Sequence, residues 1–472
     1  MSNDLITRKA TTIANKYIEV YSKGLLRAFR SINRDALNIS IYGLEDFIDK
    51  NVPCYQALIT AFNDYNIDFS LSGRDENISS IQVEYHLGEA ENFISYQVSE
   101  TSALLRLSSE TDIPVGVILV MKIVAAIIAN VKTIFKAFIL DLDDTLWPGT
   151  ILEEGFESIQ KHLTEDGIEH IRFMKYVNSL AENLGVFVAI CSRNDMEVVE
   201  QVIKKLDESI FPLKNQIDCI IANDNDKSDN IPLILEQLSV MPNSVIFIDD
   251  NIVEREKIRK RIPEIYVPDW HSQNELNNIV QIGCFFDRPE MSLRSRKKKE
   301  GLRILNTEKK KNSLPQFDIY FRQDKAHEEA RLLYRKSNQF KFSNFVPEET
   351  SGDCLSMYYI FSRDDYRDVC AVATYSNEDG HVTVRNWALS CRFFTIGLEE
   401  TMLLHFITLS DKCDKIYFNY IDSGKNIKVT EFLDRYKDFF KRCDGGICEL
   451  SVSQELIELL KKNTNLDFHI HD

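Results

Sequence analysis

Four short apolar runs in the middle of the chain constrain its fold more than any other feature. They occupy residues 135–140, 186–190, 219–221 and 244–248. Runs of this length with almost no polar residues are typical of strands that are buried on both faces of a parallel sheet. Helical patterns of apolar residues separate them, notably at 197–206 and 231–238. This alternation of strand and helix predicts a doubly wound α/β domain.

Polar side chains follow all four predicted strands. Ligand sites in open α/β sheets lie at the carboxyl ends of the strands. We therefore expect these side chains to meet in one site. In chain order they are Asp141 and Asp143, then Cys191 and Ser192, then Lys227, and finally Asp249 and Asp250.

These residue types suit displacement at phosphorus, where catalysis consists of positioning and of neutralising charge on the transferring oxygens. We expect Asp141 to attack phosphorus and to form an aspartyl phosphate. Asp143 would first protonate the leaving oxygen and then activate water. Ser192 and Lys227 would hold phosphate oxygens. Lys227 has a simpler alternative, because one lysine in the polar loop 223–230 is often only solvated.

The carboxylates also predict a magnesium site. Mg²⁺ prefers oxygen ligands, and we expect it to bind Asp141, the main-chain carbonyl of Asp143 and Asp249, with Asp250 as a further candidate. Taken alone, an Asp-x-Asp-x-Thr sequence such as residues 141–145 is also common in calcium-binding loops and capping turns. The order of the polar residues on four strands favours phosphoryl transfer. A non-catalytic interaction protein with a degenerate site is the alternative.

The segments on either side of the four runs predict further domains, since 472 residues exceed what one hydrophobic core usually organises. Residues 113–129 are nearly all apolar, but they are short for a membrane span and carry Lys122 in their middle, so we expect a buried helix. The predicted division is an α/β region of unknown role at 1–130, the parallel-sheet domain with a minimal cap at 131–290, a basic linker or helix at 291–316, and a compact α+β domain at 317–472.

Charge and cysteine usage limit the classes of partner and the compartment. The formal net charge of -17 opposes nucleic acid and anionic membranes, so neither is expected as a partner. Ten cysteines without a Cys-x-x-Cys pair indicate neither a disulfide framework nor a zinc site. The amino-terminal sequence has no basic segment followed by an apolar run and a cleavage site, and we expect a cytoplasmic protein.

Several of these segments together resemble a known family. The sequences LDLDDTLW at 140–147, CSRND at 191–195 and FIDDNIVERE at 247–256 resemble the FkbH-like branch (subfamily IIIC) of the haloacid dehalogenase (HAD) superfamily. SNQF at 337–340 and LSCR at 389–392 are similar to the acetyltransferase-like (GNAT-like) domain of that family. Asp144 and Arg193 depart from the commoner residues of the family by chemically similar changes, and residues 1–120 show no match.

The resemblance implies a specific reaction. Such enzymes take 1,3-bisphosphoglycerate, remove its phosphates and load the glyceryl unit as a thioester onto the phosphopantetheine arm of an acyl carrier protein, in polyketide-type biosynthesis. A thiol suits the acyl step because a second thiol can exchange the thioester. Cys191 is the favoured acyl acceptor, a packing role being the alternative, and Arg193 is a further phosphate-binding candidate. A small-molecule phosphatase without acyl transfer is the rival function.

The GNAT-like domain offers a second candidate site for the acyl group or the pantetheine arm, formed by Cys391, Arg392 and Asn338. Its RFFTIG sequence at 392–397 keeps one glycine, so the domain lacks the glycine-rich turn that usually binds the pyrophosphate of free coenzyme A. A carrier-borne arm needs no such turn, and structural support is the alternative role. For carrier docking we expect the basic stretches 294–299 and 309–311 to face the partner, unless they are only a solvated helix face.

Overall fold

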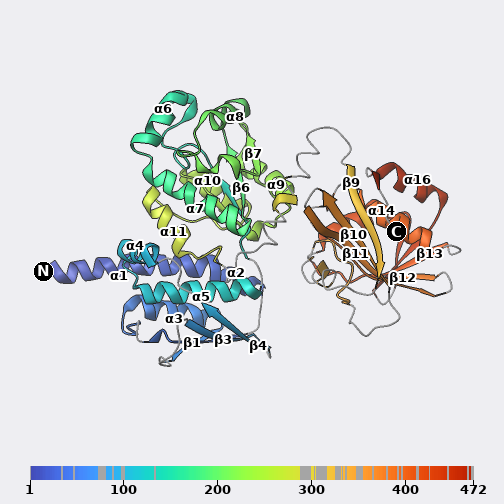
Figure 1. Cartoon of the computed structure of the whole chain (residues 1–472), viewed down its shortest axis with the longest axis horizontal. Coiled ribbons are helices and arrows are strands. Elements are labelled where there is room, and N and C mark those ends of the chain that lie inside the picture. Colours follow the sequence, from blue (N-terminus) through green and yellow to red (C-terminus); the bar gives the residue numbers. More distant parts are fainter. Residues whose placement is uncertain are drawn as a thin grey trace. The chain divides into compact units, whose positions relative to one another are not determined.

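The computed structural model divides into two compact units, Met1–Lys299 and Glu300–Asp472 (Figure 1). The described residues are 2–32, 36–45, 48–72, 81–87, 90–96, 101–131, 134–287, 299–301, 303, 316–324, 331, 333–334, 337, 339–346, 355–363, 366–378, 381–390, 393–394, 397–410, 414–424, 426–443, 446–464 and 467–468. The finer boundaries at 130, 290 and 316 remain predictions.

The first unit begins with a helical layer on a four-stranded sheet. Its elements are α1 (Ser2–Tyr21), a π-helical turn (Ser22–Leu26), α2 (Arg27–Ile32), β1 (Leu37–Tyr42), α3 (Pro53–Asp64), β2 (Ile67–Ser72), β3 (Ile81–Leu87), β4 (Ala90–Tyr96), α4 (Thr101–Thr111) and α5 (Val115–Val131). The strand order is β2-β1-β3-β4, with β1 and β2 parallel. In β1 every second residue, Leu37, Ile39 and Ile41, is buried, because alternate side chains of a strand point to opposite faces. The predicted α/β character of this region is confirmed.

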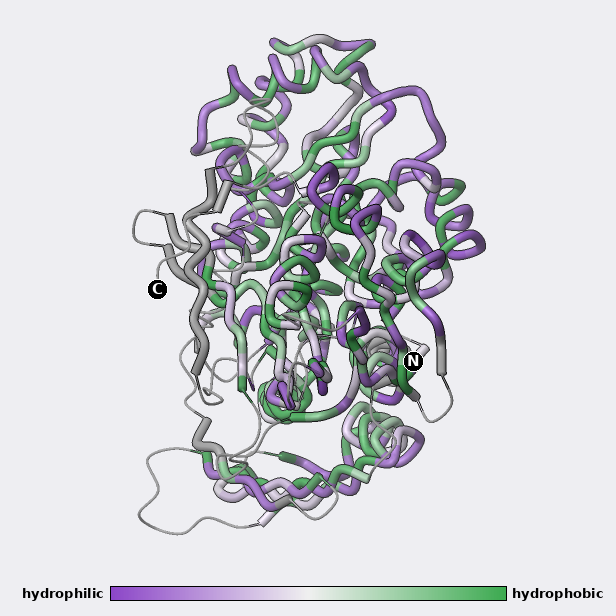
Figure 2. Tube along the Cα trace, turned by 90° about the vertical axis from the view of Figure 1, so that its right-hand side faces the viewer, coloured by the Kyte–Doolittle hydropathy of each residue, from purple (hydrophilic) through white to green (hydrophobic). Residues whose placement is uncertain are grey.

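Helix α5 is the buried apolar helix that the sequence predicts. Its residues from Val117 to Ile128 are almost all inaccessible to solvent. Figure 2, coloured by hydropathy, shows hydrophobic and hydrophilic residues alternating along many of the coils of the chain. Lys122 is accommodated in this setting because its Nζ lies 3.1 Å from Asp287 Oδ1. Among the described residues, no single helix has the length and composition to cross a membrane; the pair Ser102–Thr111 and Val115–Asn130, bent by 110°, meets that test only jointly.

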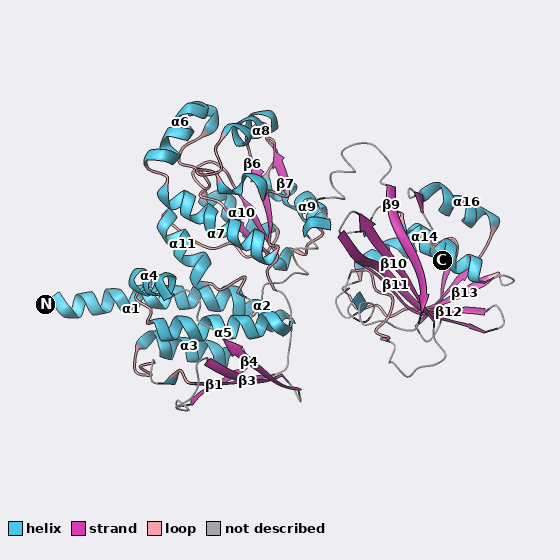
Figure 3. Cartoon of the chain, viewed as in Figure 1, coloured by secondary structure: helices cyan, strands magenta, loops and turns pink. Residues whose placement is uncertain are grey.

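The parallel sheet follows in the same unit, and it confirms the predicted doubly wound fold. Its strands β5 (Ala137–Leu140), β6 (Phe187–Ser192), β7 (Cys219–Ala222) and β8 (Val245–Ile248) lie in the order β7-β6-β5-β8, all parallel. The helices are α6 (Ile151–Glu165), α7 (Ile168–Leu184), α8 (Met196–Lys205), α9 (Lys227–Leu238), α10 (Ile252–Arg261) and α11 (Gln273–Ile282), and they surround the sheet (Figure 3). Every residue of β5, β6 and β8 is buried, which explains their unbroken apolar sequences.

Strand order places one point of this sheet apart from the rest. β5 pairs with β6 on one side and with β8 on the other. The chain first adds β6 and β7 on one side of β5 and then returns to add β8 on the other side, so the strand order reverses at β5. Ligands in open α/β sheets bind outside the carboxyl end of such a strand. Within the continuously described stretch 134–287, only α6 and α7 lie between β5 and β6, which is the minimal cap expected from the short sequence.

The second unit is an α+β domain, as predicted. Its elements are β9 (Gln316–Asp324), β10 (Leu355–Arg363), β11 (Tyr366–Glu378), β12 (His381–Leu389), α14 (Leu398–Leu409), β13 (Lys415–Asn419), α15 (Ile427–Arg435), β14 (Phe440–Cys443), β15 (Ile447–Ser451), α16 (Gln454–Asn463) and β16 (Asp467–Phe468). They form one mixed sheet in the order β14-β15-β13-β12-β11-β10-β9-β16. The buried Trp387 centres its core, with the rings of Phe342, Phe406 and Phe432 at 5.1 to 5.4 Å.

The structure corrects one expectation about the basic segment. Residues 294–298 and 309–311 lie outside the described residues, but Lys299 is described and is only 4% exposed. Its Nζ donates to the carbonyl oxygen of Val186 at 2.7 Å and lies 3.1 Å from Asp218 Oδ2. The expectation that this lysine faces a docking partner is therefore wrong, because it neutralises a buried carboxylate at the opposite, amino-terminal end of β6.

Replacing Lys299 should therefore affect stability. We expect Lys299→Met to lower the free energy of unfolding by about 3 kcal/mol, because removal of one partner leaves Asp218 buried without its counter-charge. Urea denaturation of the full chain measures this, with the exposed Lys260→Met as the matched control. Adding Asp218→Asn should restore part of the loss. Equal unfolding midpoints for Lys299→Met and the parent would contradict the structural role.

Candidate active site

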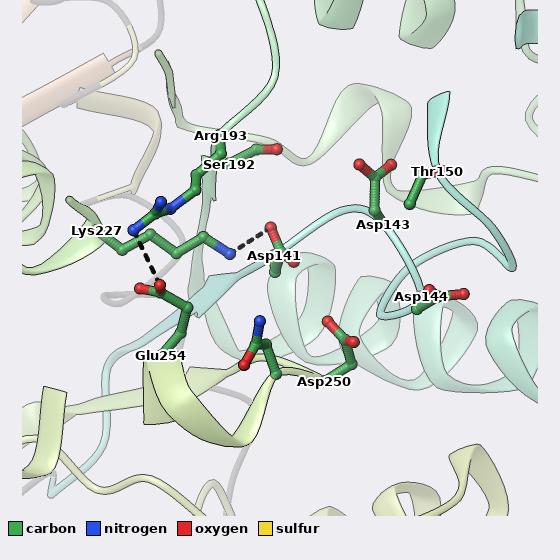
Figure 4. Close-up of a pocket in the computed structure, with 10 residues that line it drawn as sticks. Asp141, Asp143, Asp144, Thr150, Ser192, Arg193, Lys227, Asp250 and Glu254 are labelled. Atoms are coloured by element: carbon green, nitrogen blue, oxygen red, sulfur yellow. Dashed lines mark hydrogen bonds and ion pairs between the residues drawn. The ribbon is translucent and has the colours of Figure 1, made fainter. Parts of the chain in front are cut away.

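The predicted strand-end residues meet at the carboxyl edge of β5. A cavity of about 250 Å³ opens there. Figure 4 shows its lining side chains, which come from the turn after β5, the end of β6 and the loop after it, the start of α9, the loop after β8 and the first turn of α10. They are Asp141, Asp143, Asp144, Thr150, Ser192, Arg193, Lys227, Asp250, Asn251 and Glu254.

Lys227 joins two of the carboxylates directly. Its Nζ lies 2.7 Å from Asp141 Oδ1 and 2.6 Å from Asp249 Oδ2, and all three side chains are at least nine-tenths buried. Burial by itself lowers the pKa of Lys227, but Asp141 and Asp249 outweigh it and raise that pKa above its usual range. Lys227 is therefore a fixed cation. The alternative of a solvated loop lysine does not hold, because Lys227 is the first residue of α9 and points into the site.

Asp141 is placed where its ionisation depends on its neighbours. Burial, with a further contribution from the nearby Asp249, raises the pKa of Asp141 to about 7, against the opposing effect of Lys227. Asp250 is exposed at the cavity, and its partial removal from water, with Asp249 beside it, raises its pKa. Additional positive charge in the site would favour the ionised forms of Asp141 and Asp250.

The same three residues could hold a metal ion. Asp141, Asp249 and Asp250 each offer a carboxylate oxygen, and these oxygens lie within 4.8 Å of one another. A set made only of oxygen donors with excess negative charge fits Mg²⁺. The carboxylates of Asp141, Asp249 and Asp250 are thus brought together. The ligand predicted from Asp143 is its main-chain carbonyl, which stays a prediction.

The Asp143 carboxyl group lies away from that of Asp141 (Figure 4). It accepts hydrogen bonds from Trp147 Nε1 at 2.8 Å, from the Ile151 main-chain N–H at 3.1 Å and from Asn194 Nδ2 at 2.9 Å. Asp143 still lines the cavity, so it faces the space that a leaving group would occupy. The sequence argument missed Trp147 and Asn194 as partners of this carboxylate, although both stand in the motifs that carry the family resemblance.

The predicted phosphate-binding residues occupy two different settings. Ser192 is buried at the end of β6, and its Oγ accepts from Asn194 Nδ2 at 3.0 Å. Arg193 is about half exposed at the cavity mouth, where it donates to Asp226 Oδ1 at 2.6 Å and to Glu254 Oε1 at 2.9 Å. These two carboxylates, which the sequence argument did not include, already neutralise much of the Arg193 charge.

Cys191 does not have the surroundings of a nucleophile. It is fully buried within β6, it is absent from the cavity lining in the continuously described stretch 134–287, and burial raises its pKa to about 12. A reactive thiol needs exposure and a lowered pKa. The structure therefore argues against the assignment of Cys191 as acyl acceptor, and the packing alternative fits it better.

The second candidate site lies in the other unit and falls outside the described residues. This holds for Cys391, Arg392 and Asn338 alike. Nearby, β12 and β13 pair only over Thr383–Val384 and Tyr417–Phe418. Beyond that point residues 340–342 lie between the strands: Phe342 N donates to Trp387 O at 2.9 Å, Leu389 N to Phe340 O at 3.1 Å and Ile421 N to Phe342 O at 2.8 Å. These main-chain groups are thus paired with one another, and the predicted pantetheine site stays a prediction.

Comparison with solved structures finds distant likenesses. No family model and no curated protein matches the chain. It is similar to the N-terminal part of BF1531 from Bacteroides fragilis, which contains a phosphatase domain and was solved with Mg, at 23% identity over 53% of this chain and 67% of that chain, with a TM-score of 0.36.

Two further solved structures are similar over shorter parts of the chain. SP0104 from Streptococcus pneumoniae, a haloacid dehalogenase-like hydrolase, is 13% identical over 31% of this chain and 90% of its own, and nourseothricin acetyltransferase is 10% identical over 28% and 99%; both have a TM-score of 0.20. These TM-scores are too low to assign a function, so the description of the fold and of the site is based on the geometry given above.

The burial of Cys191 gives a direct test. We expect Cys191→Ala to keep phosphate release within about threefold of the parent, because the thiol touches neither the cavity nor a reacting atom. In the parent, peptide mapping after treatment with a small maleimide should find Cys191 unmodified until the protein is unfolded. Rapid modification of native Cys191, or loss of phosphate release in the alanine variant, would restore it as a candidate nucleophile.

Proposed function

We propose that this protein is an Mg²⁺-dependent phosphoryl-transfer enzyme of the HAD type with Asp141 as its nucleophile. The observation that carries the proposal is the group of Asp141, Asp249 and Asp250 around Lys227 at the carboxyl end of β5. Of these, Asp141, Asp249 and Lys227 are buried, and such a concentration of buried charge costs folding free energy. It is expected where a site must stabilise charge that develops in a transition state.

The residues allow a two-step displacement. A carboxylate oxygen of Asp141 forms a bond to phosphorus while the bond to the leaving oxygen breaks, and Asp143 gives that oxygen a proton. Water then attacks phosphorus, its proton passes to Asp143, and the Asp141–phosphate bond breaks to release phosphate. Lys227 and the Ser192 hydroxyl hold phosphate oxygens during both steps. Mg²⁺, when held by Asp141, Asp249 and Asp250, would add the charge that lets an anionic nucleophile approach an anionic substrate.

This mechanism predicts the behaviour of two substitutions. Asp141→Asn should reduce phosphate release to background, since an amide oxygen cannot attack phosphorus, and Asp143→Asn should lower kcat by about 100- to 10,000-fold. Release of phosphate from 4-nitrophenyl phosphate with Mg²⁺ present measures both. The exposed Asp224→Asn serves as the matched control, and thermal unfolding verifies the fold. Undiminished turnover by Asp141→Asn would remove the central claim.

The finer proposal is transfer of a glyceryl unit from 1,3-bisphosphoglycerate to an acyl carrier protein in the cytoplasm. It is supported by the motifs at 140–147, 191–195 and 247–256 and by the small cap, which leaves the cavity accessible to a substrate carried by a partner. Because Cys191 is buried, we favour direct attack by the pantetheine thiol of the carrier: a C–S bond forms, the C–O bond of the acyl phosphate breaks and phosphate leaves. The six free cysteines described are all buried, which suits a reducing compartment.

Intact-mass analysis of a carrier protein incubated with enzyme and 1,3-bisphosphoglycerate tests this proposal. The parent should yield glyceryl-carrier, and Cys191→Ala should yield the same product. Asp141→Asn should stop at phosphoglyceryl-carrier, because only the removal of the ester phosphate needs the aspartyl nucleophile. An unmodified carrier together with phosphate release from small esters would favour the small-molecule phosphatase.

A further inference from the structure

The carboxylate of Asp143 is held by three donors from three parts of the chain. Trp147 belongs to the turn after β5, Ile151 is the first residue of α6, and Asn194 lies in the loop after β6. Trp147 Nε1 and the Ile151 N–H both donate to Oδ1, while Asn194 Nδ2 donates to Oδ2. Trp147 and Ile151 follow Asp143 closely in the chain, whereas Asn194 reaches the carboxylate through the pairing of β5 with β6, so the local turn and the tertiary structure together set its direction.

The two side-chain donors are themselves held in place. Trp147 is fully buried, and its ring packs against Phe211 with centroids 6.0 Å apart. Asn194 is 3% exposed, and its Nδ2 also donates to Ser192 Oγ. Side chains whose rotamers are locked by packing and hydrogen bonds can hold a functional group in a productive geometry. Asn194 thus links the predicted acid/base carboxylate to the predicted phosphate-binding hydroxyl.

We infer that Trp147 and Asn194 are positioning residues that hold Asp143 at the place from which it exchanges protons with the reacting oxygens. The inference rests on the proposed function. Asp143 must give a proton to the leaving oxygen in the first step and accept one from the attacking water in the second. For both proton transfers the Asp143 carboxyl group must lie within hydrogen-bond distance of an oxygen on the side of phosphorus opposite Asp141. A small displacement of this carboxyl group therefore slows both steps.

Trp147→Phe tests the inference, because phenylalanine keeps an aromatic ring beside Phe211 but removes the N–H. With glycerol 3-phosphate, an alkyl ester whose leaving oxygen needs a proton, kcat should fall by about 10- to 100-fold while KM stays within about twofold. With 4-nitrophenyl phosphate the leaving group needs no proton, so the first step should keep its rate while the second slows. Stopped-flow absorbance should then show a stoichiometric burst of nitrophenolate followed by slow turnover.

Two further variants separate positioning from general damage. Trp147→Phe added to Asp143→Asn should cause no further loss, since a residue that acts through Asp143 has nothing left to position. Phe173→Leu removes a buried ring that packs on Phe138 and leaves Phe211 in place beside Trp147, so it should lower thermal stability yet give no burst. Asn194→Ala removes the hydrogen bond to the other carboxylate oxygen, Oδ2, and should reproduce the burst. If Trp147→Phe does not fold, Asn194→Ala is the variant that tests the inference.

The outcomes that overturn the inference differ from those that overturn the proposed function. Unchanged kcat in Trp147→Phe, equal slowing of both substrates without a burst, or a multiplied loss in the double variant would each show that Trp147 does not act through Asp143. If Asp143→Asn itself were as active as the parent, the acid/base role in the proposed function would fail. A burst in Trp147→Phe and Asn194→Ala, absent in Phe173→Leu, supports the inference.

Discussion

The rest of the site depends on the two ion pairs that the ammonium group of Lys227 forms with Asp141 and Asp249. Two carboxylates buried this closely repel each other, and removal from water further disfavours their charged forms. Lys227 neutralises one charge and fixes both side chains at 2.7 and 2.6 Å. With Asp250 alongside, the site has more carboxylates than lysines, and a further cation would balance the excess negative charge. A site of this kind suits chemistry on phosphate, which needs carboxylate and cation together.

The surrounding structure holds this charged group in place through the loops at the strand ends. The Asp250 main-chain N–H donates to Thr145 Oγ1 at 3.1 Å, and Gln273 Nε2 donates to the Thr145 carbonyl oxygen at 3.3 Å. Gln273 begins α11, whose Glu275 forms an ion pair with Lys16 of α1. The amino-terminal region, for which the sequence offered no role, thus packs on a helix that supports the catalytic loop. It completes the core behind the site.

Sequence reasoning succeeded where a residue's role follows from its position on a strand. The four apolar runs became β5 to β8, and Asp141, Asp143, Ser192, Lys227 and Asp250 line one cavity, because parallel strands bring their carboxyl ends to the same edge. The predictions failed for residues whose role depends on whether the side chain is buried. Cys191 and Lys299 both stand in segments that read as exposed or reactive, yet Cys191 is enclosed by neighbouring strands and Lys299 pairs with Asp218. A sequence does not state which side of a strand or helix is covered.

What the sequence determined by itself is the order of elements and the identity of the charged groups, since both follow from periodicity and from the residues next to strand ends. What only the tertiary structure decided is the direction and environment of each side chain. Asp143 stands two residues from Asp141, yet its carboxylate turns toward Trp147, Ile151 and Asn194. Asn194 is remote in sequence and reaches Asp143 only because β5 and β6 are neighbours in the sheet. Hydrogen bonds and burial depend on distances in space, and those are set by packing rather than by spacing along the chain.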